Sequence, residues 1–293
     1  MTPLSIVLIV VSALLHSSWN FAVKRGNRPV ALFFWVFFFG GILYLPIFFV
    51  LGVFPTFVLH APLKLWGIVI LSGLFETIYF VCLVEAYRVE DLSLVYPISR
   101  SAPLFTQIWA FLLIGEIVST QGTAGIGLVI LGLFVISLQG FKWTHFISLS
   151  RQITSRPYLL ALAAAIGSSI YSVIDKVGVQ MIHPLYYIWF VNLWMTVFIG
   201  LYLILLRRVS VLPVLQSAKK EILLIAVLQN VAYLLVLMAM TMSKVSYVVA
   251  FRQVGALFGA GMGIFLLKES HWKTRLTGAM ILTLGLALIG LAK

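Results

Sequence analysis

Three charged residues lie deep within long apolar stretches of the sequence, where charge is unusual and points to chemistry. Arg100 lies about 12 Å into its predicted helix at a rise of ~1.5 Å per residue, Arg252 lies in a comparable layer of the second half, and Glu76 is near the middle of another helix. An unpaired charge in hydrocarbon costs a few kcal/mol or more, so such residues usually face a partner or a ligand. The arginines could clamp a carboxylate, and Glu76 could carry a proton unless an arginine keeps it ionised. The alternative is a structural pair between Glu76 and Arg100 that locks two helices together.

The balance of buried charges predicts the sign of a ligand. Two arginines enter the apolar layer, whereas Glu76 is the only acid expected at a similar depth. One positive charge is therefore left for a bound anion to neutralise. Because the planar guanidinium grips a carboxylate in two places, we predict that the cargo carries a negative group, such as the carboxylate of an amino acid, and that Arg100 contacts it.

Polar side chains of the first helix share a face beside Trp19. His16, Asn20 and Lys24 recur every four residues, which suits either a cavity wall or interhelical hydrogen bonds. A histidine among apolar neighbours is more typical of a packed, hydrogen-bonded residue than of a proton relay. Lys24 is expected to reach the membrane interface. The predicted substrate-binding residues are Arg100, Glu76, Tyr79, Trp19, Asn20, Tyr96, Tyr171, Gln229, Arg252 and Gln253.

The sixth helix carries a comparable polar face. Ser168, Ser172 and Lys176 recur at the same spacing, with Tyr171 and Asp175 adjoining them. The same two interpretations apply to this face, a cavity wall or hydrogen bonds between helices. Lys176 is expected to snorkel to the interface.

The composition identifies a polytopic membrane protein. Of the 293 residues, 62% are apolar and 10% are charged, and the mean hydropathy is +1.12. The formal charge of +12 does not indicate a nucleic-acid partner, because the Lys and Arg residues fall in short connections between apolar segments. The single cysteine, Cys82, excludes a disulfide framework and a thiolate metal cluster. The sequence contains no HExxH, GxSxG or phosphate-cradling glycine loop, so we predict no enzyme, no metal and no cofactor.

Ten apolar stretches are long enough to cross ~30 Å of hydrocarbon as helices. They lie near residues 3–23, 30–52, 64–86, 92–114, 120–140, 157–178, 184–206, 221–242, 245–267 and 273–292. Because helices satisfy their own backbone in lipid, we predict an all-α membrane protein with ten transmembrane helices. The segment Met1 to Leu4 carries no Lys or Arg and no small-residue cleavage site follows the first apolar stretch, so we expect no cleaved signal peptide.

The two halves of the chain resemble each other. Residues 86–138 recur without a gap 153 positions later, at 239–291. We place the first repeat at 1–140, a basic linker at 141–156 and the second repeat at 157–293. Five helices per copy is an odd number, so the copies enter the membrane from opposite sides and form two inverted repeats, with a substrate site near the midplane. The matched pairs include Glu116 and Glu269, Gly125 and Gly278, and Gly132 and Gly285.

A row of small residues also recurs in the two copies. It consists of Ala102, Thr106 and Ala110 in the fourth helix, and of Gly255, Gly259 and Gly263 in the ninth. This four-residue spacing lets membrane helices pack backbone to backbone. The pattern predicts that Gly259→Leu abolishes folding or activity, whereas Gly290→Leu near the end of the last helix is tolerated.

The fourth helix carries signals for a bend and for a contact at its end. Pro97 and Pro103 remove backbone donors and are expected to kink the helix, which frees carbonyls to face a cavity. Glu116 and its copy Glu269 lie where helices four and nine end, a position that the helix dipole disfavours for an anion. We expect each carboxylate to accept hydrogen bonds from the amides that open the next helix.

The distribution of Lys and Arg between the two sides of the membrane predicts the orientation. The connections on one side hold 14 of these residues and the connections and chain end on the other side hold four. The positive-inside rule therefore predicts that both termini lie outside the cytoplasm. Reporter domains that are active only in the cytoplasm should be inactive when fused to either terminus.

Several motifs together resemble the drug/metabolite transporter superfamily, specifically its ten-helix EamA-type members. They are LLHSSWNFAVKRG in the first helix, YPISRSAPLF in the fourth, the Gly115-Glu116 that ends it, and the Gly-rich fifth helix. The resemblance implies a carrier of small metabolites, and it implies termini inside the cytoplasm, opposite to the Lys and Arg count.

The resulting prediction is a secondary transporter that moves an amino acid or a related anion or zwitterion by alternating access, in the direction of export. Its partners are the small-molecule substrate, the lipid bilayer of a bacterial inner membrane, and a coupling ion such as a proton; the oligomeric state stays open. The alternatives are a membrane receptor or scaffold without transport, and a flippase of lipid-linked sugars. Counterflow of a labelled cargo in liposomes separates a carrier from a receptor.

Overall fold

The helices of the computed structural model account for all ten predicted stretches. The structure describes residues 1–26, 30–50, 52, 60–89, 92–138, 155–258, 261 and 272–292, without the side chains of 20–26, 89 and 92–94. Within these ranges the chain forms helices and turns and no strands. The elements are α1 (Pro3–Gly26), α2 (Val30–Val50), α4 (Leu63–Val89), α5 (Leu92–Ser99), α6 (Ala102–Ile114), α7 (Thr120–Ser137), α9 (Arg156–Met181), α10 (Pro184–Leu201), η1 (Tyr202–Arg207), α11 (Leu212–Met242), α12 (Val245–Phe251), η2 (Arg252–Val254) and α14 (Trp272–Leu291).

The ten-helix membrane fold is confirmed. Seven helices of the described chain are long and apolar enough to cross a membrane, and Pro3–Trp19 and Val245–Phe258 form shorter apolar helices. The remaining predicted stretch, 92–114, is divided into α5 and α6. The largest boundary difference is in α11, which begins at Leu212 and has a non-helical residue at Ala218 (φ −135°). The predicted start at 221 therefore lies just after this kink, where the apolar part of the helix begins.

Helices four and nine are both interrupted, at matching positions. Helix four stops after Ser99 and resumes at Ala102, between Pro97 and Pro103, so the predicted kink is confirmed. Helix nine changes to a 3₁₀ turn over Arg252–Val254, which is offset by 153 residues from the first break. The second copy keeps the break without either proline. Each break therefore lies where an arginine enters the apolar layer.

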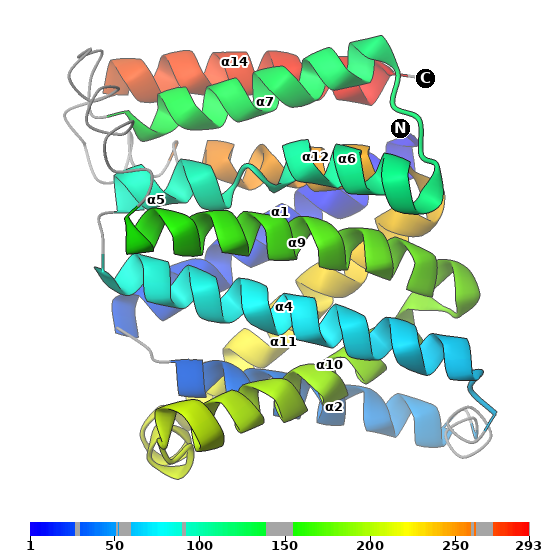
Figure 1. Cartoon of the computed structure of the whole chain (residues 1–293), viewed down its shortest axis with the longest axis vertical. Helices are drawn as coiled ribbons and strands as arrows, with labels where there is room; N and C mark the ends of the chain where they lie inside the picture. Colours follow the sequence, from blue (N-terminus) through cyan, green and yellow to red (C-terminus); the bar gives the residue numbers. More distant parts are fainter. Residues whose placement is uncertain are drawn as a thin grey trace.

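The contact between α7 and α14 shows that the two repeats are inverted. A Cβ atom placed on Gly125 would lie 2.9 Å from the carbonyl oxygen of Gly285, and one placed on Gly132 would lie 2.8 Å from that of Gly278. The partner's number falls as the chain number rises, so the two helices are antiparallel. Because Gly278 and Gly285 are the repeat copies of Gly125 and Gly132, an axis in the membrane plane exchanges the two contacts. Figure 1 shows this helix pair lying side by side along one edge of the bundle.

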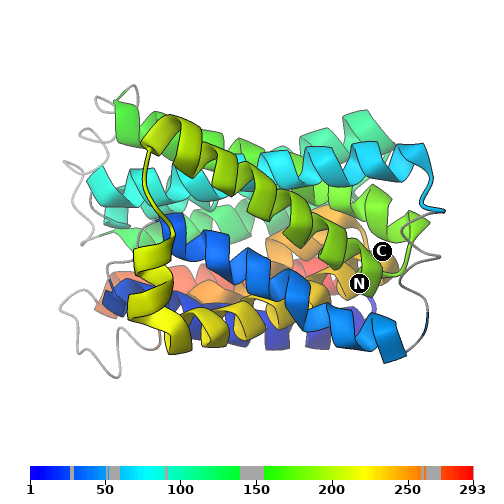
Figure 2. The same cartoon turned by 90° about the horizontal axis from the view of Figure 1, so that it is seen from below.

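The opposite edge of the bundle is formed by α2 and α10, which pack against each other (Figures 1 and 2). Between the two edges, α4 packs on α9 and α1 packs on α11. Both termini lie at the same end, as an even number of crossings requires. The Met1 ammonium donates to the carbonyl oxygens of Gly290 at 3.4 Å and Ala292 at 3.3 Å, so the first and last residues of the bundle meet.

The predicted small-residue row is only partly described. Ala102, Thr106 and Ala110 are buried, as close packing requires. A Cβ atom on Gly255, however, would meet no atom closer than Ser17 Oγ at 3.6 Å, which is ordinary contact distance. The close backbone approach lies instead between α7 and α14. Gly259 and Gly263 lie outside the described residues.

Glu116 binds the start of a helix, as predicted, but the helix belongs to the other repeat. Its Oε2 accepts from the amide of Val245 at 2.8 Å, and its Oε1 accepts from the amide of Ser246 at 3.0 Å and from that side chain's hydroxyl at 2.6 Å. A carboxylate is favourable at a helix N-terminus, where free amides and the helix dipole both attract it. The expectation that Glu116 binds the next helix, α7, was therefore wrong. Glu269 lies outside the described residues.

We expect Glu116→Ala to lower stability by about 2 kcal/mol, because it removes a charged acceptor from three donors at the start of α12. The measurement is the thermal unfolding midpoint of the purified protein in detergent. Gln216→Ala, at an exposed position of α11, is the control and should leave the midpoint unchanged. Equal midpoints for Glu116→Ala and the control would show that the contact does not hold the two repeats together.

Candidate functional site

A cavity lies in the middle of the bundle, where α1, α4, α9 and α11 meet the break in helix nine. It offers about 20 Å³ to a water-sized molecule, which is room for about one water. A substrate would therefore need the helices to move apart, so the cavity is too small for a substrate in this conformation. Its lining residues are Ser12, His16, Trp19, Glu76, Tyr79, Phe80, Tyr171, Gln229, Ala232, Tyr233 and Arg252.

Six of the ten predicted site residues line this cavity, and they come from both repeats. The six are Glu76, Tyr79, Trp19, Tyr171, Gln229 and Arg252. Glu76 and Gln229 are repeat copies of each other, so their presence in one cavity places it near the axis that relates the repeats. Tyr96, Gln253 and Arg100 do not line it, and the side chain of Asn20 lies outside the described residues.

Arg252 and Arg100 differ in their relation to the cavity although both lie at helix breaks. Arg252 lines it, with its guanidinium carbon 5.5 Å from the centre of the Tyr233 ring. The guanidinium carbon of Arg100 lies 5.2 Å from the centre of the Tyr96 ring, one turn back on its own helix. These are cation–π distances, which stabilise a charge that has left water.

The ion pair between Glu76 and Arg100, which was the structural alternative to a ligand site, is not formed. No ion pair within 4.0 Å joins either residue to an opposite charge in the described part of the chain. Glu76 is 2% exposed, and its Oε2 atom has no hydrogen-bond partner among the described residues. A buried acceptor without a donor is costly, so its presence in a cavity indicates a place where a ligand donor can bind.

Two other buried groups of the cavity lining also lack partners in the described structure. Gln229 has no donor to its Oε1 atom, and Trp19 has no acceptor for its Nε1 group. Both side chains are at most 6% exposed. The cavity lining therefore has two hydrogen-bond acceptors, Glu76 on α4 and Gln229 on α11. It also has two donors, which are Trp19 on α1 and Arg252 at the break of helix nine.

Asp175 is the main polar feature that the sequence analysis missed as a site residue. It is fully buried on α9 and accepts from three hydroxyl groups, those of Ser72, Tyr187 and Tyr233. The network joins α4, α9, α10 and α11, and Tyr233 extends it to the cavity wall. The expectation that Glu76 is the only deeply placed acid was therefore wrong. The signal was available, because Asp175 stands one turn after Tyr171 and adjoins the polar face of the sixth helix.

The polar face of the sixth helix forms contacts between and within helices. Lys176 is 8% exposed and donates to the carbonyl oxygens of Met240 and of Ser243, the latter at 3.1 Å. It therefore binds the C-terminal end of α11, where free carbonyls attract a cation. The prediction that Lys176 extends to the membrane interface was wrong, because its side chain is buried in this contact. Ser172 donates to the Ser168 carbonyl at 2.7 Å within its own helix.

The comparisons with known proteins identify the family. The sequence matches the EamA-like transporter family twice, over residues 3–138 and 155–291. The chain belongs to this family. A crystal structure described only as "Crystal structure of protein" has the same fold as this EamA-like chain, with a TM-score of 0.73 at 19% sequence identity over 97% of this chain and 95% of the other. No curated protein sequence matches the chain.

A second polar cluster of this EamA-like transporter extends from the central cavity toward α2 and α10. Asn192 on α10 donates to Asn230 on α11 at 2.6 Å, and both side chains are buried. Gly40 of α2 covers the pair closely, because a Cβ atom there would lie 2.9 Å from Asn192 Oδ1. The pair lines a smaller cavity that also touches Glu76 and Gln229. Polar groups therefore continue from the central cavity into the α2 side of the bundle.

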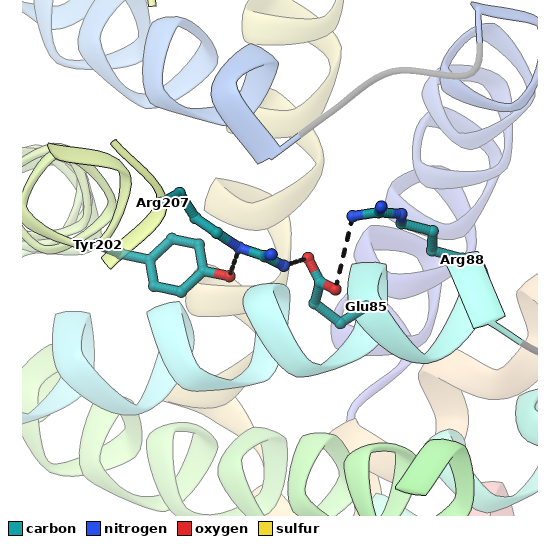
Figure 3. Close-up of polar contacts among 4 residues, drawn as sticks. All are labelled: Glu85, Arg88, Tyr202 and Arg207. Carbon is teal, nitrogen blue, oxygen red and sulfur yellow. Dashed lines mark hydrogen bonds and ion pairs between the residues drawn. The ribbon is translucent and has the colours of Figure 1, made fainter. Parts of the chain in front are cut away.

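An ion pair joins α4 to η1 at the end of the bundle opposite the termini. Arg207 donates to Glu85, and its Nε also donates to the Tyr202 hydroxyl at 2.7 Å, as Figure 3 shows. Arg88 approaches the other oxygen of Glu85 at 4.0 Å. The Arg88 side chain is 71% exposed and that of Arg207 is 37% exposed, so the pair contributes little to stability. It joins helices three and seven at this end of the bundle.

Proposed function

We propose that this EamA-like protein is a secondary carrier of a zwitterionic amino acid or a close relative, with the substrate held in the central cavity. The observation that carries the proposal is the set of buried polar groups without partners in one cavity. Glu76 Oε2 and Gln229 Oε1 supply acceptors for an ammonium group. Arg252 supplies a fork of donors for a carboxylate, and Trp19 Nε1 adds a further donor.

The charges of the core favour a zwitterion over a simple anion. With Asp175 buried beside the cavity and Glu76 ionised in the substrate-bound state, the two arginines are matched by two acids, so no positive charge is left over for a simple anion. An amino acid brings one charge of each sign and leaves this balance unchanged. The aromatic side chains of Tyr79, Phe80 and Tyr171 line the same cavity and suit an apolar or aromatic substrate side chain.

The direction and membrane are proposed from the family resemblance. EamA-type members include exporters, which supports export across a bacterial inner membrane. Movement between two openings of the cavity agrees with a small central site lined by both inverted repeats. The contact between Glu85 and Arg207 is then one of the contacts that must open when the cavity faces the end opposite the termini.

Counterflow in proteoliposomes tests the proposed substrate class. Proteoliposomes that contain the full chain are loaded with a set of unlabelled amino acids. Uptake of each labelled amino acid is then compared with uptake of its labelled amide and of its labelled des-amino analogue. We expect the amino acid to exchange and both analogues to fail, because each lacks one of the two charged groups. Equal transport of all three compounds would overturn the proposal, and so would a complete absence of amino-acid counterflow.

Arg252→Gln and Arg100→Gln form a matched pair, because both arginines lie at a helix break over a tyrosine ring. Since only Arg252 lines the cavity, we assign the carboxylate contact to it in place of Arg100. Arg252→Gln should lower amino-acid counterflow by ~30-fold, which corresponds to about 2 kcal/mol, and Arg100→Gln should lower it less. Gel filtration of both variants controls for folding. A larger loss in folded Arg100→Gln would return the carboxylate contact to Arg100.

A further inference from the structure

We propose that Glu76 is the coupling site of the carrier, where a proton and the ammonium group of the substrate bind in alternation, while Asp175 stays ionised. The inference rests on the proposed function for the identity of the substrate. The assignment of the two acids rests on geometry alone. Both lie in the core near each other, yet their hydrogen bonds differ completely.

Asp175 has three hydrogen-bond donors directed at its carboxylate. Its Oδ1 accepts from the hydroxyls of Ser72 and Tyr187, the latter at 2.7 Å, and its Oδ2 accepts from the Tyr233 hydroxyl. An ionised carboxylate can only accept, and three donors directed at it stabilise the charged form. Arg252 lies over the ring of Tyr233, so Asp175 and Arg252 face each other across that side chain. The positive charge of the cavity is therefore matched by Asp175.

Glu76 has the surroundings of a carboxyl group that changes its state. Its Oε2 atom is buried in the cavity wall with no donor among the described residues. The groups that face it are His16 on α1, Tyr79 on its own helix, Tyr171 and Asp175 on α9, Tyr233 on α11, and Arg252 at the break of helix nine. From α2 and α10, Phe37 and Asn192 share the smaller cavity with it and neither titrates.

The electrostatic consequence is that a cavity without substrate favours protonated Glu76. A second buried negative charge beside Asp175 is unfavourable when no ion pair holds it. When the substrate binds, its ammonium supplies the missing positive charge, and the carboxyl releases its proton to the aqueous side that the cavity faces. When the substrate leaves on the other side, Glu76 takes up a proton there. One proton moves against one zwitterion, so one positive charge crosses the membrane in each cycle.

The repeat copy limits the stoichiometry to one proton. Gln229 occupies the position in the second repeat that Glu76 occupies in the first, and an amide does not titrate in water. The inverted repeats therefore place one titrating group and one fixed acceptor beside the same cavity. The ammonium binds between the two, but only Glu76 exchanges it for a proton.

Carbodiimide labelling tests the assignment of the acids without any knowledge of the substrate. Dicyclohexylcarbodiimide reacts with protonated carboxyl groups in apolar surroundings and adds to them as an acylurea. The full chain in proteoliposomes is treated in acidic, neutral and alkaline buffers, and the adduct is located by peptide mass spectrometry. We expect modification of Glu76 that decreases in alkaline buffer, no modification of Asp175, and loss of the adduct in Glu76→Gln. An adduct on Asp175, or none on Glu76, overturns the assignment.

Transport measurements test the coupling separately from the proposed function. In the wild type, a pH gradient should drive amino-acid accumulation, and substrate addition should move protons in the opposite direction. Glu76→Gln should show slower counterflow, no response to the gradient and no proton movement. Wild-type counterflow of amino acids without any response to the gradient would overturn the coupling but leave the proposed function intact. Absence of counterflow would overturn the proposed function, and the labelling result would still decide which acid is protonated.

Discussion

Gly132→Leu should leave no folded protein. A Cβ atom at this position would lie 2.6 Å from the amide nitrogen of Leu282 and 2.8 Å from the carbonyl oxygen of Gly278, both in the backbone of α14. Backbone atoms of a helix cannot rotate away as a side chain can, so the two helices must separate. In lipid, helices associate through close packing, and this separation removes the contact that joins the repeats along one edge. We expect a loss of ~3 kcal/mol or more.

Gly127→Leu on the same helix is the matched control, because a Cβ atom there would meet nothing within 4 Å. The measurement is the yield of monodisperse protein after detergent extraction, followed by the thermal unfolding midpoint. Gly127→Leu should match the wild type, and Gly278→Leu should repeat the damage from the other side of the contact. Normal yield for Gly132→Leu would show that α7 and α14 do not depend on close approach. Gly290→Leu should also be mild, since a Cβ atom there would lie 3.8 Å from Ile6.

Asp175→Leu should be the most damaging change in the polar core. It would leave the hydroxyls of Ser72, Tyr187 and Tyr233 buried without their acceptor, and each orphaned group costs about 1–3 kcal/mol. The summed loss, ~3 kcal/mol at the least, is a large part of the stability of an ordinary domain. We expect a steep fall in thermal midpoint and in the yield of folded protein.

Asp175→Asn separates the loss of acceptors from the loss of charge. The amide oxygen can still accept from two hydroxyls, and the Tyr233 hydroxyl can turn to accept from the amide group. The thermal midpoint of this variant should therefore lie much closer to the wild type than that of Asp175→Leu. If the two variants unfold at the same temperature, the charge of Asp175 matters for folding and the hydroxyl network does not.

The fold could be predicted because hydropathy and the repeat act over whole helices. Apolar stretches long enough to span a bilayer, and an odd number of them in each copy, determine ten helices with inverted halves. The break in helix four followed from Pro97 and Pro103, whose missing amides cannot complete a helix. The break at Arg252 in helix nine has no such local signal in the sequence. The structure shows it at the position that matches the break in helix four in the register of the repeat.

The candidate site could be predicted in its residue types but not in its pairings. Glu76 and Arg252 stood out because each is a charge in an apolar stretch, and both line the cavity. Arg100 satisfied the same rule, yet its side chain lies at the Tyr96 ring, and no spacing in the sequence separates the two cases. Hydrogen bonds between helices that are distant in the sequence could not be predicted either, because no spacing in the sequence indicates them. Glu116 binds residues 129 and 130 positions away in the other repeat.

The glycine contact between α7 and α14 also constrains how the chain is made. The fifth helix enters the membrane long before the tenth leaves the ribosome. The glycine face of the fifth helix therefore contacts lipid or a neighbouring chain while the second half is synthesised. The first five helices alone therefore lack the partner that covers this face. In a nascent chain, release from the insertion machinery and final assembly should coincide with the arrival of Gly278 and Gly285, 153 positions after Gly125 and Gly132.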